Sequence, residues 1–99
     1  MNLQINFHHI DSTEALKGKI GEKAEKLKKY FEGDFRVVWT CEVQGHEQSS
    51  HIHLTGKNLD LNAQASDEDL YKTFDVAIAK IEKQLAKHKT QVKDKIHRH

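Results

Sequence analysis

Apolar residues alternate with polar ones in four short segments of the chain, and they recur every three or four residues in two longer segments. Alternation places apolar side chains on one face of a β-strand, whereas the longer spacing places them on one stripe of an α-helix. The alternating segments are 3–9, 34–43, 51–55 and 59–65, and the helical ones are 12–31 and 66–93. The predicted order is therefore strand, helix, three strands and helix.

Two packed layers satisfy this pattern, because each strand has one apolar face and each helix one apolar stripe. We predict an α+β fold, β-α-β-β-β-α, in which both helices cover one face of a four-stranded sheet. The first helix would form a right-handed crossover if the first two strands pair in parallel, and the last three strands would form a meander. The prediction is one domain over residues 1–93 and a short basic, histidine-containing tail over 94–99.

The expected element ends follow from local chemistry. Asp11, Ser12 and Thr13 are all competent caps for the first helix, and Gly33 is expected to end it. Ser66 is the expected cap of the second helix, with acids 67–69 in its first turn. The polar segment 44–50 is expected to be a loop.

Gly18 and Gly21 lie inside the first predicted helix. Each costs on the order of 1 kcal/mol relative to alanine in a helix interior. The sequence therefore predicts that something packs closely against this helix or that the helix is locally soft.

Composition narrows the class of protein. The 99 residues are 36% hydrophobic and 31% charged, with no apolar run of the roughly 20 residues that a membrane helix needs. The N-terminal residues show no secretory signal, and a single cysteine, Cys41, cannot form an internal disulfide. We expect a soluble cytoplasmic protein that contacts no membrane.

Positive charge gathers at one end of a chain whose formal net charge is only +1. Residues 1–79 carry nine Lys and Arg against thirteen Asp and Glu, a net −4, whereas residues 80–99 carry seven against two, a net +5. Such an asymmetry is typical of a chain with a polyanionic partner.

Three lysines of the second helix, Lys80, Lys83 and Lys87, fall within roughly 60° of one another and away from the apolar stripe. None has an acid three or four residues away; instead they neighbour one another, which is unfavourable in an isolated helix. Solvation is the ordinary explanation for any single surface lysine. The uncompensated group indicates a contact with phosphates instead.

The first helix carries six lysines, which include Lys23, Lys26 and Lys29. Glu22 and Glu25 precede Lys26 and Lys29 by four residues, an arrangement that stabilises exposed helices. Both helices presenting ammonium groups would nevertheless make one broad cationic surface. Lysine is a point charge rather than a bidentate fork, so such a surface would recognise nucleic-acid shape and backbone rather than sequence.

Other candidate chemistry is weaker. His51 and His53 alternate on one strand and could bind a metal with His8 or Asp60 if the strand register allowed it, although exposed polar positions explain them more simply. Cys41 and Trp39 fall on the apolar face and are expected to pack in the core. Tyr71 borders the stripe of the second helix and is expected to pack as well. No arrangement indicates an enzyme, and no cofactor is expected.

Residues 68–89, EDLYKTFDVAIAKIEKQLAKHK, resemble the second helix of the ribosome hibernation promoting factor and ribosome-associated inhibitor family. Residues 12–31, STEALKGKIGEKAEKLKKYF, resemble its first helix, and the order of elements is that of the family. The likeness covers nearly the whole chain. Its most specific parts are the triplet 69–71, Asp75, and the Lys83-Gln84-Leu85-x-Lys87 spacing.

This resemblance implies a stress or stationary-phase factor that binds the small ribosomal subunit in the messenger and transfer RNA channel near the decoding centre. It implies inhibition of translation and stabilisation of inactive ribosomes. The chain resembles the short form of the family and lies nearer its hibernation promoting branch, which implies ribosome pairing with a helper protein. It further implies a monomer when free. The residues that it implies for binding 16S-type ribosomal RNA are Lys23, Lys26, Lys29, Lys80, Lys83 and Lys87.

Two other functions remain open from the residues alone. A general double-stranded RNA-binding module has a similar sheet with two helices, but it begins with a helix and has basic residues at the start of its last helix. This chain has a strand first and acids at 67–69. A metal-dependent or small-molecule protein built around the histidines is the third possibility.

Overall fold

A computed structural model describes the backbone of residues 1–97 and the side chains of residues 1–88. Residues 1–97 form four strands and two α-helices in the predicted order, and a 3₁₀ helix follows the first α-helix. The elements are β1 (Asn2–His8), α1 (Glu14–Glu25), η1 (Lys26–Tyr30), β2 (Arg36–Gln44), β3 (Glu47–Gly56), β4 (Leu59–Asp67) and α2 (Leu70–His97). Residues 94–97 of the predicted tail are helical, and 98–99 lie outside the described residues.

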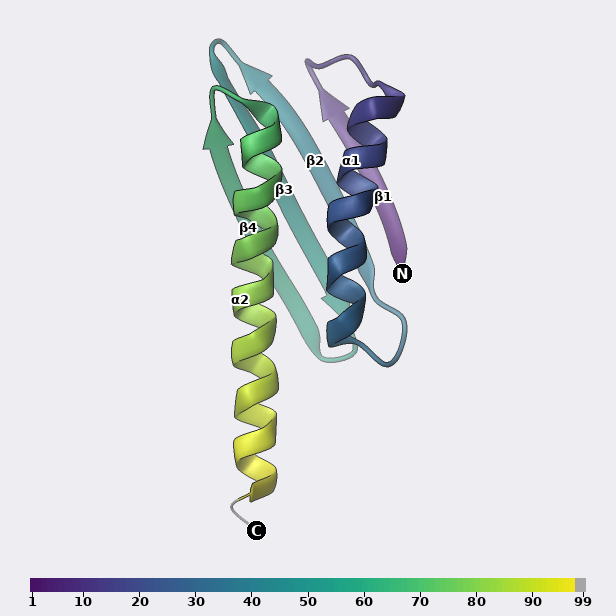
Figure 1. Cartoon of the computed structure of the whole chain (residues 1–99), viewed down its shortest axis with the longest axis vertical. Coiled ribbons are helices and arrows are strands. Elements are labelled where there is room, and N and C mark those ends of the chain that lie inside the picture. The colour runs from purple at the N-terminus through teal and green to yellow at the C-terminus, as the bar shows by residue number, and fades with distance from the viewer. Residues whose placement is uncertain (98–99) are drawn as a thin grey trace.

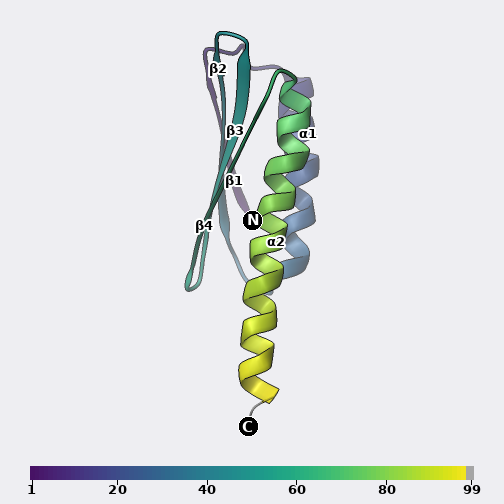
Figure 2. The ribbon, with the colours of Figure 1, turned by 90° about the vertical axis from the view of Figure 1, so that its left-hand side faces the viewer.

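The strands lie side by side in the order β1-β2-β3-β4 (Figure 1). β1 pairs with β2 in parallel, and the other neighbours are antiparallel, which confirms the predicted crossover pairing and meander. Both helices cover the same face of the sheet (Figure 2). α2 packs on β3 and β4, and α1 lies beside it over the β1 side. The predicted two-layer fold is confirmed.

The core lies between the sheet and the two helices. Trp39 of β2 and Phe74 of α2 are fully buried and meet edge to face, with 5.6 Å between ring centroids. Leu16, Ile20, Ala24 and Leu27 contribute the stripe of the first helical segment. The Trp39 Nε1 is buried with no hydrogen-bond partner in the described part of the chain, a cost of about 1–3 kcal/mol that the surrounding packing must offset.

The first helix is shorter than predicted. Thr13 is its cap, since the hydroxyl Oγ1 accepts a bond from the Leu16 N–H at 3.1 Å, as expected for one of the three candidates. The α-helix ends at Glu25 and tightens into η1, and Phe31 is already extended. The prediction that helix continues to Phe31 is therefore wrong. Phe31 turns away to stack on Phe35, with centroids 4.0 Å apart, and that contact replaces a further helical turn.

The polar segment 44–50 is not a loop. β2 and β3 form a hairpin that turns through Gly45 and His46 alone, and Gln44 pairs with Glu47. Gly45 supplies the positive φ of 62° that such a tight turn requires, which lets both strands continue. Alternation of apolar residues fails here, because Gln48, Ser49 and Ser50 are polar on both faces of β3.

The second helix also begins later than predicted. Ser66 is still in β4, and the acids lie before the helix rather than in its first turn. The Asp67 carboxylate accepts from the Asp69 N–H, and the Asp69 carboxylate accepts from the Tyr71 N–H, both at 2.9 Å. Asp69 therefore takes the capping role that was predicted for Ser66. Two successive turns of this kind carry the chain from the sheet edge onto its face.

Three buried polar side chains link β2, β3 and α2. The Thr73 hydroxyl donates to the Leu70 carbonyl, so it can only accept from the Ser50 hydroxyl, which lies 2.8 Å away. Ser50 in turn can accept from the Cys41 thiol, 3.9 Å away. Burial raises the pKa of Cys41, which keeps this thiol protonated and able to donate. The hydrogen-bonded chain fixes the N-terminal turns of α2 on the sheet.

We expect Thr73→Val to lower the free energy of unfolding by about 1–3 kcal/mol, because it leaves the buried Ser50 hydroxyl without its acceptor. Ser50→Ala combined with Thr73→Val removes both partners and should cost less than the sum of the single changes. Urea unfolding of the four proteins measures the coupling. Strictly additive costs would show that the two hydroxyls do not depend on each other.

Candidate nucleic-acid interface

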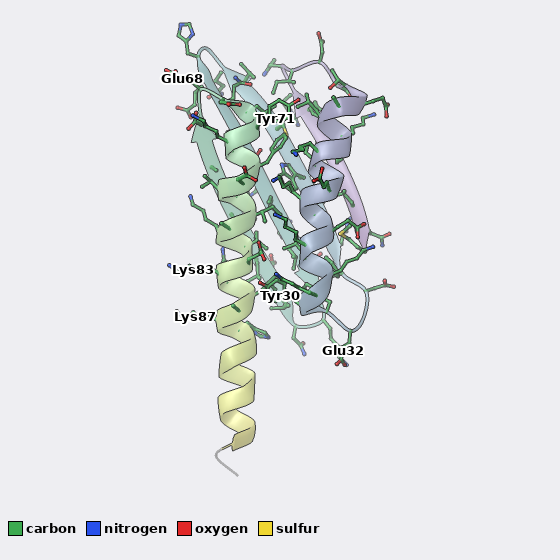
Figure 3. All side chains as sticks on the ribbon, viewed as in Figure 1. Tyr30, Glu32, Glu68, Tyr71, Lys83 and Lys87 are labelled. Carbon is green, nitrogen blue, oxygen red and sulfur yellow. The ribbon has the colours of Figure 1, made fainter. Side chains whose placement is uncertain are left out.

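The flank of α2 that faces away from α1 carries Lys83 and Lys87 (Figure 3). Both side chains are exposed. Neither has a hydrogen-bond or ion-pair partner among the described side chains, in contrast to other lysines of the two helices. Together they form what we call the lysine flank. Its free ammonium groups are available to an external anion.

Lys80 lies one turn before the lysine flank but is bound to the protein itself. Its Nζ donates to the Gln64 carbonyl of β4 at 2.7 Å, and the Gln84 side-chain amide donates to the Asn62 carbonyl at 2.9 Å. β4 is an edge strand, so these carbonyls have no strand to pair with. Lys80 therefore covers a sheet edge in addition to any role in binding.

Lys23 of α1 lies between the helices, where it binds Asp75 of α2. The Nζ and Oδ1 atoms are 2.6 Å apart, and only 15% of the lysine side chain is exposed. This hydrogen-bonded ion pair lowers the pKa of Asp75 and raises that of Lys23. Lys23 thus joins α1 to α2 and is not a free ammonium group.

Lys29 and Tyr30 make the second contact between the helices. The Lys29 ammonium group is 3.3 Å from the Glu82 carboxylate, and the Tyr30 hydroxyl donates to the same carboxylate at 3.1 Å. Tyr30 points toward α2 from the end of η1 (Figure 3). Burial, followed by the bond to Glu82, raises the pKa of Tyr30. Glu82 therefore fixes the C-terminal end of the first helical segment against α2.

The remaining lysines of the first helical segment pair differently from the prediction. The expected pairs of Glu22 with Lys26 and Glu25 with Lys29 are wrong: Glu22 binds Lys19 at 3.7 Å and Glu25 binds Lys28 at 2.9 Å, both three residues apart. The 3₁₀ geometry after Glu25 explains the second change, because it brings residues three apart onto one line. Lys26 is exposed and makes no bond with a described side chain, although its charge also lowers the pKa of Asp75.

The six predicted lysines therefore do not form one continuous cationic surface. Acids of α2 occupy the space between the helices, where Lys23 and Lys29 are paired. The lysine flank lies on the far side of α2. Sequence reasoning missed Asp75 and Glu82 as partners, because their contacts join residues 52 and 53 apart along the chain and no local spacing reveals them.

The histidines are bonded on the open face of the sheet. His51 Nε2 lies 3.0 Å from the Asn62 side-chain oxygen, and His53 Nε2 lies 2.7 Å from the Asp60 carboxylate. The strand register leaves His8 opposite Glu42, far from both. No cluster of three His, Cys, Asp or Glu side chains capable of holding a metal occurs among the described residues. Within the same residues, no helix has the length and apolar character to cross a membrane.

A family described as "Sigma 54 modulation protein / S30EA ribosomal protein" matches residues 3–93. The chain belongs to this family. A relative named "Ribosome hibernation promoting factor" from Salmonella typhimurium is 34% identical over 94% of this chain and 98% of its own length. The protein of that name from Escherichia coli K12 is 33% identical with the same coverage. A "Ribosome hibernation promotion factor" from Bacillus subtilis is 31% identical, and this chain spans about half of it, 52%.

Solved structures share the fold. The Thermus thermophilus Protein Y N-terminal domain superposes with a TM-score of 0.83 at 20% identity, covering 89% of this chain and 99% of that domain. A ribosomal subunit interface protein from Coxiella burnetii gives 0.81 at 22% identity, covering 91% and 99%. These likenesses support the order and layering of elements in this family member.

The Lys23–Asp75 contact makes stability depend on pH. Because the folded-state pKa of Asp75 lies below its ordinary 3.8, the pair stabilises the fold above that pH and is lost as pH falls through the lowered pKa. We expect Asp75→Asn to lower the urea midpoint modestly at pH 7 and to match the parent once the pH lies below the lowered pKa of Asp75. Glu25→Gln, which breaks a pair within one helical segment, is the control. An Asp75→Asn deficit that persists at low pH would contradict this account.

Proposed function

We propose that this chain binds the ribosome and holds it inactive, and that the lysine flank contacts ribosomal RNA phosphates. Membership of this family supports the ribosome as the partner. The observation that carries the proposed contact is that Lys83 and Lys87 project from the same flank of α2 with no acid three or four residues away and no partner among the described side chains. Like charges one turn apart repel, and a bound polyanion would relieve that cost.

The six lysines have unequal proposed roles. Lys83 and Lys87 are the primary phosphate contacts, and Lys26 is a third free ammonium group on the first helical segment. Lys80 can exchange its bond to the Gln64 carbonyl for a phosphate, because the side chain is exposed. Lys23 and Lys29 chiefly position the helices through Asp75 and Glu82. Their contribution to affinity is expected to be smaller.

The proposed mechanism is occupancy, with no catalytic step. A two-layer domain of 53 × 22 × 18 Å that lies in the messenger and transfer RNA channel of the small subunit, near the decoding centre, would exclude both RNAs by volume. The cytoplasm is then its place of action, under stress or in stationary phase. Ribosome pairing with a helper protein belongs to the same proposal, as does a chain that is monomeric at low concentration.

A general double-stranded RNA-binding module fits less well. The chain begins with β1, and α2 is preceded by acids and begins with an Asp69 cap rather than with basic residues. Duplex RNA as a competitor distinguishes the two functions. Under the proposal, an excess of duplex RNA does not displace the chain from ribosomal subunits, whereas a general duplex-binding module would be displaced.

We expect Lys83→Glu combined with Lys87→Glu to weaken cosedimentation with small ribosomal subunits by on the order of 10- to 100-fold at physiological salt. Each lost phosphate contact should reduce the slope of log affinity against log salt by roughly 0.7–0.9. Adding Lys80→Glu should weaken binding further.

The matched control is Lys17→Glu with Lys28→Glu, which changes the net charge equally on the flank of the first helical segment that faces away from α2. Binding of this control within about threefold of the parent, on the scale where tenfold is 1.4 kcal/mol, identifies position rather than total charge as the determinant. Equal loss in both variants would reduce the effect to non-specific attraction and overturn the proposed contact.

A further inference from the structure

The two edge strands of the sheet, β4 and β1, differ in whether side chains of the chain bind their outer backbone groups. At the β4 edge, Lys80 and Gln84 bind the carbonyls of Gln64 and Asn62. At the other edge, β1 is a seven-residue strand, NLQINFH, that contains no lysine, no acid and no proline. No described side chain bonds to its outer backbone groups. β1 therefore lacks the usual protections against pairing with another strand.

The backbone direction shows which groups of β1 are free. The Asn2 N–H points inward and donates to the Phe35 carbonyl at 2.9 Å. Successive residues of a strand alternate in direction, so Gln4, Asn6 and His8 also point toward β2. The N–H and C=O groups of Leu3, Ile5 and Phe7 consequently point out of the sheet, ready to pair with a further strand.

The side chains of the same three residues form an incompletely covered apolar row. Leu3, Ile5 and Phe7 face the helix layer but are only half-buried, whereas their neighbours on β2, Val37, Trp39 and Cys41, are fully buried. α1 crosses over β1 (Figure 1), yet it leaves these three side chains partly exposed. An added strand with an apolar row of its own would complete this burial.

The side of α1 that faces away from α2 carries two glycines. Lys23 faces α2, and Gly18 and Gly21 lie within about 40° of the opposite direction on the helix. A Cβ atom added at either glycine would meet nothing within 4 Å, so packing inside this chain does not require them. The close-partner explanation that the sequence suggested is therefore unmet within the described part of the chain, and these glycines lie on the side of α1 away from α2.

We propose that two copies of this chain pair antiparallel through β1 about a two-fold axis at Ile5, forming one continuous eight-stranded sheet. Ile5 then lies opposite Ile5 of the second copy, Leu3 opposite Phe7, and Gln4 opposite Asn6. Apolar side chains meet apolar ones and amides meet amides, so the strand complements itself in this register.

The charges of α1 and η1 follow the same symmetry. The two-fold axis makes the first helices of the two copies antiparallel, and Gly21 is the midpoint of residues 14–28. About that midpoint, Glu14 of one copy faces Lys28 of the other, and Lys17 faces Glu25. Both of these pairings join opposite charges; Lys19 and Lys23, which the same midpoint also relates, lie on the α2 side of the helix, near Asp75. This match favours a second copy over a partner chain of unrelated charge.

The dimer leaves the lysine flank free, because β1 and β4 are opposite edges of the sheet and α2 lies on the β4 side (Figure 1). Its two lysine flanks would lie at the two outer ends. A single strand pair with two helix flanks is a small interface, so association should be weak and depend on concentration. The proposal does not require the proposed ribosome function.

Sedimentation velocity over about a hundredfold range of concentration tests the pairing, together with amide hydrogen exchange. We expect a monomer–dimer equilibrium, with exchange at Leu3, Ile5 and Phe7 slowing as the dimer forms. The amides of Gln4, Asn6 and His8 should be protected at every concentration, because β2 already binds them. A chain that stays monomeric throughout overturns the proposal, and so does a dimer in which the three outer amides still exchange rapidly.

Two double variants differ only in the sign of one charge across the axis. Gln4→Glu with Asn6→Glu places like charges opposite each other and should raise the dimer dissociation constant at least about tenfold. Gln4→Glu with Asn6→Lys places opposite charges there and should dimerise at least as well as the parent. Both keep an acceptor for Arg36, which donates to Gln4 at 2.9 Å, so the fold is maintained. Equal dimerisation of the two variants would contradict the Ile5-centred register.

Discussion

The burial of Phe74 against Trp39 is the interaction on which the rest of the molecule depends. A helix that buries one stripe has its rotation about its own axis fixed, and this edge-to-face contact lies at the centre of the stripe of α2. The residues opposite the stripe must then face solvent in a set direction. Lys83 and Lys87 owe their position to apolar packing at the other side of the helix, and no interaction of their own holds them.

The polar contacts refine this arrangement. The hydroxyl chain through Ser50 and Thr73 fixes the beginning of α2 on the sheet, and Glu82 fixes its middle against η1 through Tyr30 and Lys29. Asp75 joins the two helices between these points. The acids of α2 thus neutralise the lysines that point inward and leave unneutralised those that point outward. Which lysines of the two helices remain free therefore depends on their acidic partners as well as on the number of lysines.

Periodicity predicted the layers, the order of elements and nearly all of the core, because burial imposes its spacing directly on the sequence. Periodicity failed at positions where polar residues are buried in the sheet or turn the backbone. Ser50 is buried in β3 although the polar sequence predicts a loop there, because its hydrogen-bond partner Thr73 lies 23 residues away and no local spacing reveals the contact. The helix start moved from Ser66 to Leu70 because two carboxylates, Asp67 and Asp69, turn the backbone before the helix begins.

The same limit applies to the candidate site. Helical spacing identified the lysine flank correctly as lying away from the apolar stripe, but it could not show that Lys23 and Lys29 are paired across the helix interface. Spacing within one helix contains no information on what the neighbouring helix presents. The open β1 edge was likewise invisible before the strand order was known, because an edge is a property of the sheet and not of the strand.

The most direct measurement is lysine footprinting of the chain bound to small ribosomal subunits, in which acetylation rates are compared with those of the free protein. We predict strong protection at Lys83 and Lys87 and unchanged modification at Lys17, which lies on the side of α1 away from α2. If Lys83 and Lys87 are modified as fast in the complex as in the free chain, the lysine flank does not face the ribosome and the account is wrong.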